Sequence, residues 1–378
     1  MRLSQKASLP RGFLASGISC GIKRSGKPDY GLFYSSLPAR VACTFTRNTL
    51  KAAPVEVNEE ILRTARTCRA ILVNSGNANC FTGKAGRKDT LATGAAVRRA
   101  LGLAPGELLY ASTGIIGKRL PAEKMIAAVP RLIEGLNRRG IGEAAKAILT
   151  TDSGTKEVTA RTVIGAERVT LCGVAKGAGM IAPDMATMLC FVMTDAAVSS
   201  RALKSALREA VDDSFNCISV DGCMSTNDSV MLLANGAAGN KPVDSGPALS
   251  RFKQALHAVC RDLARKIVLD GEGAGKYITL KVSGARTKPE AKKVALEIAG
   301  SVLFKTAMYG ENPNYGRIVA SVGASGVNVS QERLKIRMSP LHKRGISVNV
   351  HLGRGGAHCT VYTTDMTPEY IRINAEYS

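Results

Sequence analysis

The chain has 378 residues, of which 45% are hydrophobic, and its 52 lysines and arginines against 30 aspartates and glutamates give a formal net charge of +22. This length and composition fit one large α/β body or two to three domain-sized units with a sizeable core. Aromatic residues make up only 4%, which disfavours stacking platforms for single-stranded nucleic acid. The basic clusters are short, so the charge fits anionic small molecules better than nucleic acid.

Helical and strand-like segments alternate along the chain, which predicts an α/β fold. No linker rich in proline, glycine or serine divides the chain, so the sequence places no domain boundary. Pro121 is expected at the first position of its helix. In chain order, the patterns predict a strand over 69–74, a helix over 121–136, strands over 169–175 and 188–195, helices over 199–213 and 245–268, a strand over 277–284, a helix over 288–310 and strands over 345–352 and 358–364.

Several site classes are disfavoured by the sequence. The ten cysteines form no CxxC pair, which argues against a structural zinc site and indicates a reduced, intracellular chain. The apolar stretch 179–196 contains Pro183 and Asp184, which a bilayer centre penalises. The glycine-rich stretch 270–279 has Asp270 and Tyr277 where a phosphate-binding P-loop needs Gly and Ser or Thr, so it is interpreted as a turn. The N-terminus lacks the apolar region of a secretory signal.

Histidine, the usual general base, is scarce: the first 256 residues contain none, and only four occur in all. One route to an activated nucleophile needs no histidine. A threonine at a chain N-terminus can use its own α-amine as the base for its hydroxyl. Thr187 would reach that state if the peptide bond after the small Ala186 were cleaved. Taken alone, a threonine before a strand is far more often structural.

The surroundings of Thr187 are more informative. The stretch KGAGMIAPDMATMLCFVMTDA closely resembles the cleavage-site signature of the ornithine acetyltransferase family, whose members are also called arginine biosynthesis bifunctional proteins or glutamate N-acetyltransferases. The resemblance covers nearly the whole chain. The further matching blocks, in order, are GFLASGISCGIKRSGKPDYGLFYSS, RNTLKAAPV, VNSGNANCFTG, ASTGIIGKRLP, TTDSGTKE, SFNCISVDGCMSTND, DGEGAGK, KTAMYGENPNYGRI and YIRINAEYS.

This resemblance implies self-cleavage between Ala186 and Thr187, giving an α chain, 1–186, and a β chain, 187–378, with two of each per assembly. It implies transfer of an acetyl group from N-acetylornithine to glutamate by a ping-pong route through an acetyl-enzyme. Acetyl-CoA stays open as a second donor. The implied fold is the DmpA/ornithine acetyltransferase-like α/β fold, with layered sheets packed between helices, and no metal or organic cofactor is implied.

The resemblance also implies roles for single residues. Thr187 is the nucleophile, and Thr113 and Gly114 form the oxyanion hole, whose donors acyl transfer needs. Lys176 could pair with the α-carboxylate of the substrate, and Glu272 with the δ-ammonium of ornithine. The substrate-binding positions of the family fall on Thr151, Lys176, Thr187, Glu272, Asn374 and Ser378, with Thr150 as the neighbouring alternative to Thr151 and Ser378 one position earlier than the family's terminal hydroxyl residue.

Two other functions are weighed beside this one. The same cleaved threonine could pass the acyl group to water, as in an amidase or aminopeptidase. A basic nucleic-acid-binding protein with a degenerate site is the more distant alternative. The family-like opening begins near residue 8, which leaves little room for an organellar presequence. A cytoplasmic protein without nucleic-acid or membrane partners is therefore expected.

Overall fold

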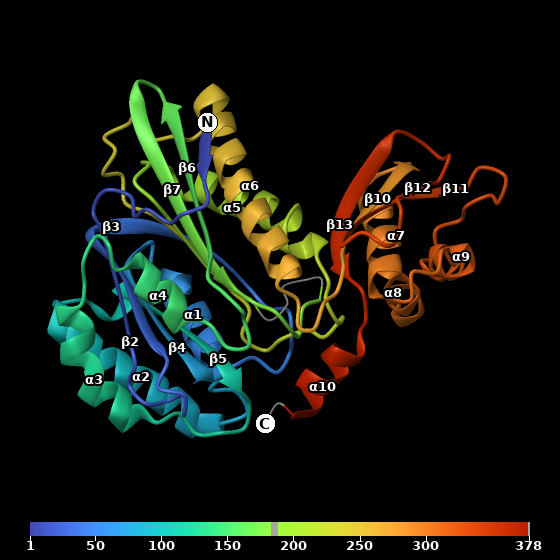
Figure 1. The fold of residues 1–378 in the computed structure, drawn as a ribbon. Helices are drawn as coiled ribbons and strands as arrows, with labels where there is room; N and C mark the ends of the chain where they lie inside the picture. The colour runs from blue at the N-terminus through green and yellow to red at the C-terminus, as the bar shows by residue number, and fades with distance from the viewer. Residues whose placement is uncertain (183–187, 377–378) are drawn as a thin grey trace. The chain divides into compact units, whose positions relative to one another are not determined.

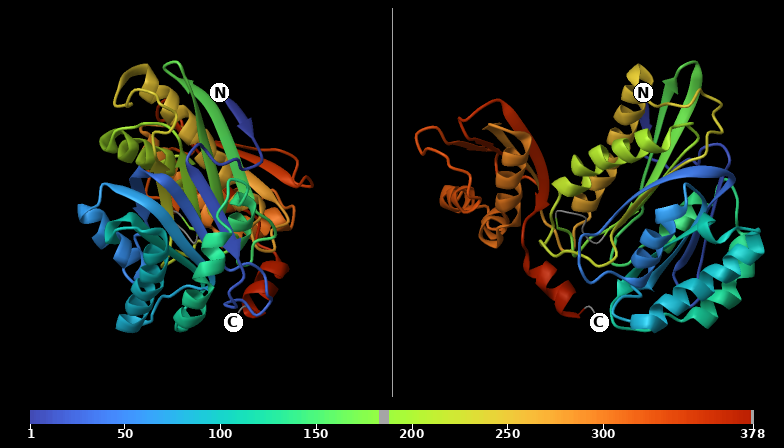
Figure 2. Two further views of the ribbon diagram at one scale, coloured as in Figure 1. Left: turned by 90° about the vertical axis from the view of Figure 1, so that its left-hand side faces the viewer. Right: turned by 180° about the vertical axis from the view of Figure 1, so that it is seen from behind.

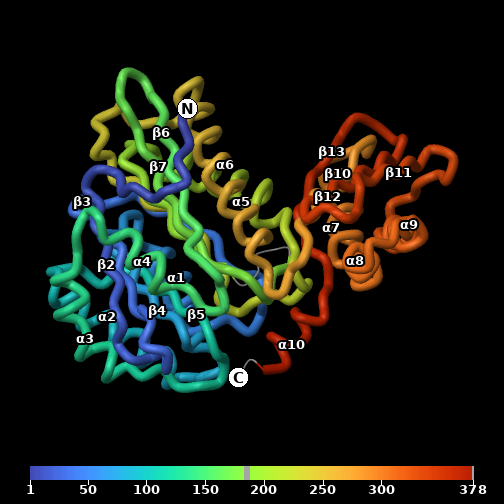
Figure 3. Tube along the Cα trace, viewed as in Figure 1, coloured from blue at the N-terminus to red at the C-terminus, as the bar shows by residue number. Residues whose placement is uncertain are grey.

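The computed structural model describes residues 1–182 and 188–376, and the chain divides into two compact units, each described by itself below. Unit 1 comprises Met1–Gly177, Thr187–Asp213 and Ser225–Leu263, and unit 2 comprises Ala178–Ala186, Ser214–Met224 and Ala264–Ser378. The chain therefore leaves and re-enters unit 1 more than once, which can be followed along the tube in Figure 3. This repeated crossing explains why no single linker was found in the sequence.

Unit 1 is built on a mixed sheet in the order β1-β6-β7-β8-β9-β3-β4-β5, with β2 pairing with β3. The strands are β1 (Arg2–Ser4), β2 (Phe13–Ile18), β3 (Tyr30–Phe45), β4 (Thr67–Asn77), β5 (Leu108–Ile115), β6 (Lys156–Ile164), β7 (Glu167–Lys176), β8 (Leu189–Thr194) and β9 (Ser229–Ala234). The predicted strands over 69–74, 169–175 and 188–195 are thereby confirmed as β4, β7 and β8.

The long strand β3 joins two layers of this sheet. Its first part pairs with β4, from Tyr30 opposite Asn74, and its last part pairs with β9, ending with Phe45 opposite Ser229. One apolar core takes residues from β3, β4 and β5 on one side and from β7, β8 and β9 on the other. The rings of Phe33 and Phe191 meet in that core with their centroids 5.0 Å apart. The sheet is thus folded over, and its two halves pack face to face.

Helices cover the outer faces of both layers (Figures 1 and 2). A second core joins β3, β4 and β5 to the first three helices, and α6 packs so closely on β7 that a side chain at Gly173 would clash with Val259. Every residue of β8 is buried, because this strand is covered on both faces. The helices of unit 1 are α1 (Ala53–Thr64), α2 (Gly83–Leu101), α3 (Ala122–Glu134), α4 (Ile141–Ala147), α5 (Ser200–Asp212) and most of α6 (Gly246–Leu269).

The predicted layered α/β architecture is therefore confirmed. The predictions of helix ends were less accurate. Ser199 caps α5 as expected, by accepting a hydrogen bond from the backbone N–H of Ala202. Pro121 precedes α3 instead of being its first residue. Within the described parts of the chain, no helix is long and apolar enough to span a membrane.

Unit 2 has a smaller sheet in the order β11-β12-β10-β13, which packs on helices around a core of its own. The predicted single helix over 288–310 is wrong: the segment forms two helices, because Ser301 ends one and caps the next by accepting from the N–H of Phe304. The elements are β10 (Tyr277–Ala285), α7 (Lys288–Gly300), α8 (Val302–Tyr309), α9 (Tyr315–Ala324), β11 (Lys335–Met338), β12 (Gly345–His351), β13 (Ala357–Thr364) and α10 (Pro368–Glu376).

A lysine is buried in unit 2. Lys305 of α8 is 1% exposed, and its ammonium nitrogen lies 3.2 Å from Thr363 Oγ1 and 2.9 Å from Thr364 Oγ1 on β13. Burial lowers the pKa of Lys305 to about 7, although the nearby charges of Asp365 and Asp221 oppose this shift. Folding therefore disfavours the charged form of Lys305, which is the ordinary form of a lysine in water.

This burial predicts a pH-dependent stability. Between about pH 7 and pH 10 the unfolded chain binds a proton at Lys305 that the folded chain has released. The free energy of unfolding should therefore rise with pH across this window, by up to about 1.4 kcal/mol per pH unit from this group. Urea unfolding of wild type and Lys305→Met at one fixed protein concentration should show a steeper rise for wild type. Parallel pH profiles would contradict the assignment.

Candidate functional site

Two buried lysines of unit 1 share one buried carboxylate where β7 ends. Lys176 is the last residue of β7, Lys156 is the first of β6, and each is 2% exposed. Lys156 Nζ donates to Asp152 Oδ1 over 2.7 Å, and Lys176 Nζ lies 3.8 Å from Asp152 Oδ2. Burying an ammonium group is costly without a counter-ion. Asp152 is therefore what allows Lys176 to stay charged at this depth.

The same carboxylate also holds the backbone around it. The N–H of Gly177 donates to Asp152 Oδ1 over 2.6 Å, and the N–H of Thr150 donates to Oδ2 over 3.0 Å. Burial alone would raise the pKa of Asp152, but the charges of Lys176 and Lys156 and these hydrogen bonds hold it well below its usual range. Asp152 is thus a carboxylate that fixes the end of β7 and the turn before β6 together.

The predicted oxyanion residues, Thr113 and Gly114, lie beside this cluster, in the last part of β5, where they pair with Ser75 and Gly76 of β4. Lys176 Nζ donates to Thr113 Oγ1 over 3.4 Å and to Thr150 Oγ1 over 2.7 Å. Gly114 has a φ of 129°, and a Cβ at this position would lie 2.4 Å from the carbonyl carbon of Gly76. Only glycine fits there, because the backbone of β5 approaches the end of β4 so closely. The structure therefore places the Lys176 ammonium beside the end of β5 that carries Thr113 and Gly114.

Of the two neighbouring threonines, Thr150 accepts a hydrogen bond from the Lys176 ammonium at its hydroxyl. Thr151 is half-buried next to it, and its role as a binding residue stays a prediction. A third basic group, Lys23, also approaches this region. Burial lowers the pKa of Lys23 to about 8, and the charge of Lys176 contributes to the lowering. The surroundings of Lys176 are thus well suited to an anionic group.

Two adjacent residues just before β9 connect this end of β5 with the chain just before β8. Asn227 Nδ2 donates to the carbonyls of Ala78 and Ser112, over 2.6 and 2.8 Å, and so holds the chain next to Thr113. The fully buried Asp228 accepts the N–H of Met188 at 2.8 Å. Among the described residues, its second oxygen has no hydrogen-bond partner. Burial raises the pKa of Asp228 well above its usual value, which favours its protonated form.

Unit 2 brings two other predicted residues together. Asn374 of α10 donates from Nδ2 to Glu272 Oε2 over 3.0 Å. The carboxylate of Glu272 lies against Gly179, where a Cβ would come within 2.1 Å of Oε2, and the N–H of Glu272 donates to the carbonyl of Ala178 over 3.0 Å. The glycine-rich stretch 270–279 is indeed a turn that leads into β10.

Further carboxylates and hydroxyls of unit 2 hold these segments. Asp365 Oδ1 accepts the N–H groups of Gly275 and Lys276, both over 2.9 Å, and Thr367 Oγ1 donates to the carbonyl of Gly273 over 2.6 Å. Asp221 accepts the N–H groups of Met180 and Ile181 over 2.6 and 2.9 Å. These contacts fix the turn that carries Glu272 and the chain that precedes residue 183.

Some predicted residues lie outside the described part of the chain, namely Ala186, Thr187 and Ser378. The sequence analysis missed Asp152, Asp221 and Asp228 as organising carboxylates, although all three lie in the quoted blocks TTDSGTKE and SFNCISVDGCMSTND. The available signal was an acidic residue in a block rich in hydroxyl groups, and only the fold shows what it binds. In residues 1–182 and 188–376, no group of histidine, cysteine and acidic side chains could hold a metal ion.

The sequence of this chain was compared with those of known proteins. The arginine biosynthesis bifunctional protein ArgJ of Geobacter sulfurreducens is 42% identical over 97% of this chain and 99% of its own length. The glutamate N-acetyltransferase of Methanopyrus kandleri is also 42% identical, over the same shares. A crystal structure of ornithine acetyltransferase from Mycobacterium tuberculosis with ornithine is 41% identical, with a TM-score of 0.45, and the match covers 48% of this chain and 97% of that one. The model of the ArgJ family matches residues 14–378, and the chain therefore belongs to the ArgJ family.

Proposed function

We propose that this protein is a glutamate N-acetyltransferase of arginine biosynthesis, which moves an acetyl group from N-acetylornithine to glutamate. The names of its relatives supply the activity. The observation that supports the proposal in this chain is the contact of the buried Lys176 ammonium with Thr113. A cation that could bind a carboxylate thus stands beside a residue that we propose for the oxyanion hole. An acyl transfer between two amino acids needs both groups.

The chemistry that we propose starts with self-cleavage. The Thr187 hydroxyl attacks the carbonyl of Ala186, its proton passes to the peptide nitrogen, and the C–N bond breaks to give an ester on the Thr187 oxygen and a free α-amine. Water then hydrolyses that ester, which releases the Ala186 carboxylate and restores the Thr187 hydroxyl. That amine then takes the hydroxyl proton while the oxygen attacks the acetyl carbonyl of N-acetylornithine. The proton passes to the α-nitrogen of ornithine, which leaves. In the second half, the α-amine of glutamate attacks the acetyl ester and restores the free hydroxyl.

The described residues support distinct parts of this sequence. Backbone donors at Thr113 and Gly114 would stabilise the developing oxyanion, and Lys176 would hold the α-carboxylate that donor and acceptor share. We propose Glu272, with Asn374, for the δ-ammonium of ornithine. Asp228 binds the N–H of Met188, the residue after Thr187, so it would anchor the backbone that carries the nucleophile.

Several finer points are part of the proposal. The product chains would be residues 1–186 and 187–378, and two of each would form the assembly. Thr151 and Ser378 would complete the substrate contacts. Acetyl-CoA stays open as a second donor, and localisation in the cytoplasm stays a prediction from the sequence.

The first test is of self-cleavage. Wild-type protein on a denaturing gel should give two fragments, each about half of the chain, and N-terminal sequencing of one should begin at Thr187. Thr187→Ala should give one full-length band, because alanine has no hydroxyl to attack the preceding carbonyl. Thr194→Ala is a suitable control, since Thr194 is the last residue of β8 and follows Thr187 in the same fragment. A wild-type chain that stays intact after prolonged incubation would refute the nucleophile assignment.

A second test concerns Asp152. Asp152→Asn removes the carboxylate shared by Lys156 and Lys176, and breaking such a buried pair should lower the free energy of unfolding by about 3–5 kcal/mol. KM for N-acetylornithine should rise, because Lys176 loses the group that positions it. The exposed pair of Glu143 and Lys146 provides the control, and Glu143→Gln should change stability by less than about 1 kcal/mol.

The pH dependence of this difference has a definite sign. The pKa of Asp152 is lowered by folding, so its stabilisation is fully present above its unfolded pKa of about 4 and is lost as the pH falls below it. The gap between wild type and Asp152→Asn in urea unfolding should therefore be constant near pH 7 and shrink on acidification. A gap that grows on acidification, or an unchanged KM, would contradict the role of Asp152.

A further inference from the structure

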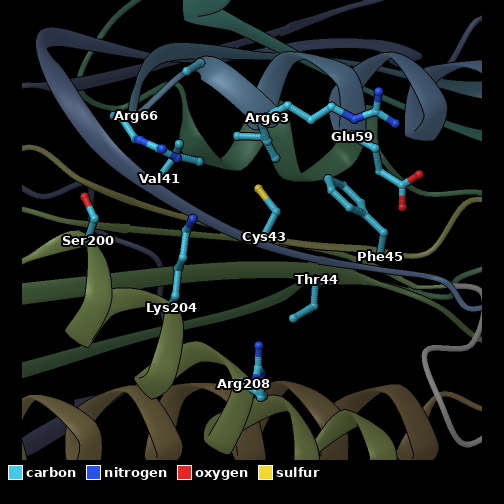
Figure 4. A pocket seen from close by; sticks show the side chains of 12 residues that line it. Val41, Cys43, Thr44, Phe45, Glu59, Arg63, Arg66, Ser200, Lys204 and Arg208 are labelled. Atoms are coloured by element: carbon cyan, nitrogen blue, oxygen red, sulfur yellow. The ribbon is translucent and has the colours of Figure 1, made fainter.

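A basic pocket on unit 1 is lined by residues that take no part in the candidate site (Figure 4). It has a volume of about 320 Å³. Its walls are the last residues of β3, the end of α1 with the turn that follows it, and one face of α5. None of the predicted catalytic or substrate-binding residues lines it, so the transferase chemistry does not account for its composition.

The pocket gathers basic side chains that have no partner among the described residues. Four basic side chains line it, and none of them makes an ion pair or side-chain hydrogen bond to another residue within 1–182 and 188–376; they are Arg63, Arg66, Lys204 and Arg208. The acidic residue among the lining residues, Glu59, is already bound to Lys51 over 2.6 Å. Lys204 and Arg208 stand four residues apart on α5, where like charges destabilise a helix. A bound anion would remove that repulsion.

The two ends of the pocket differ in character. Figure 4 shows Arg66 and Lys204 approaching each other from opposite walls, near the hydroxyl of Ser200, on one side of Cys43. Phe45 lies on the other side of Cys43 and is only partly buried. Arginine forks and an ammonium suit a phosphate group, whereas the partly buried aromatic ring suits a flat apolar body. The pocket thus fits a compact anion that is attached to a ring.

We propose that this pocket binds a nucleoside phosphate, with the phosphate between Arg66 and Lys204 and the base against Phe45. The volume is near the lower limit for small-molecule sites, which fits one nucleotide. A dicarboxylate such as glutamate offers charge without a ring. A nucleic-acid strand would need a longer groove, with several stacking platforms. The site is independent of acetyl transfer, so its failure and that of the transferase would be seen in different assays.

The test is calorimetric titration of the intact protein with adenosine 5′-monophosphate at physiological salt. Wild type should bind this nucleotide, and Arg66→Ala and Lys204→Ala should each weaken the affinity by about tenfold, the loss expected for one charge-assisted contact. Inorganic phosphate should bind more weakly than the nucleotide, because it leaves Phe45 unused. Glutamate and a short single-stranded oligonucleotide should bind this pocket no better than phosphate does.

Arg201→Ala is the matched control on the same helix. Arg201 is exposed, points to Asp244 with 2.7 Å between Nη2 and Oδ2, and is not a lining residue. The substitution Arg201→Ala removes the same charge as Lys204→Ala and should change the affinity by less than about twofold. Lys204→Ala itself should transfer acetyl groups at the wild-type rate. The proposal is overturned if the nucleotide gives no binding heat, if phosphate, glutamate or the oligonucleotide binds as tightly and loses that affinity in Lys204→Ala, or if Arg201→Ala weakens nucleotide binding as much as Lys204→Ala.

Discussion

The buried contact between Asp152 and the lysines at its two oxygens is the interaction on which the candidate site depends. A buried ammonium keeps its charge only if an opposite charge stands close to it. Asp152 provides that charge for Lys156 and Lys176 and binds two backbone N–H groups as well. The end of β7 and the turn before β6 are thereby held as one piece, with the Lys176 ammonium directed at Thr113.

The folded-over sheet explains why distant segments supply this site. Because β3 pairs with β4 in one layer and with β9 in the other, the loops at the ends of β5, β7 and β9 come together. Asn227 then binds the carbonyl of Ser112, and Asp228 binds the N–H of Met188. Two successive residues thus connect the end of β5 with Met188, the residue after Thr187. In an acyl transfer, backbone segments held in this way need not rearrange when the transition state forms.

The sequence predicted the elements of the fold better than the contacts between them. Period-two and apolar runs found β4, β7, β8, β10, β12 and β13, because strand patterns follow from local burial. The split at Ser301 was missed, since the apolar pattern continues through it and a single capping serine decides the break. The division into two units could not be predicted from the sequence, because the segments in which the chain crosses between them lack the composition of a linker.

The candidate residues divide in the same way. The ordered motif blocks led to Lys176, Thr113 and Gly114, and to Glu272 with Asn374, and the structure places the members of each set together. The sequence did not identify Asp152, Asp221 and Asp228 as organising carboxylates, because an aspartate that binds backbone N–H groups has no specific sequence signature. The sequence also could not predict the pocket beside α5. Its four basic side chains, which have no partner among the described residues, come from two regions of the chain more than a hundred residues apart.

The central claim is that the acetyl group passes through Thr187. The most direct measurement is mass spectrometry of the protein after incubation with N-acetylornithine in the absence of glutamate. The fragment that begins at Thr187 should gain the mass of one acetyl group, peptide mapping should place it on Thr187, and added glutamate should remove it. A fragment that gains no mass under rapid quench, or an acetyl group found on another residue such as Lys176, would contradict the account.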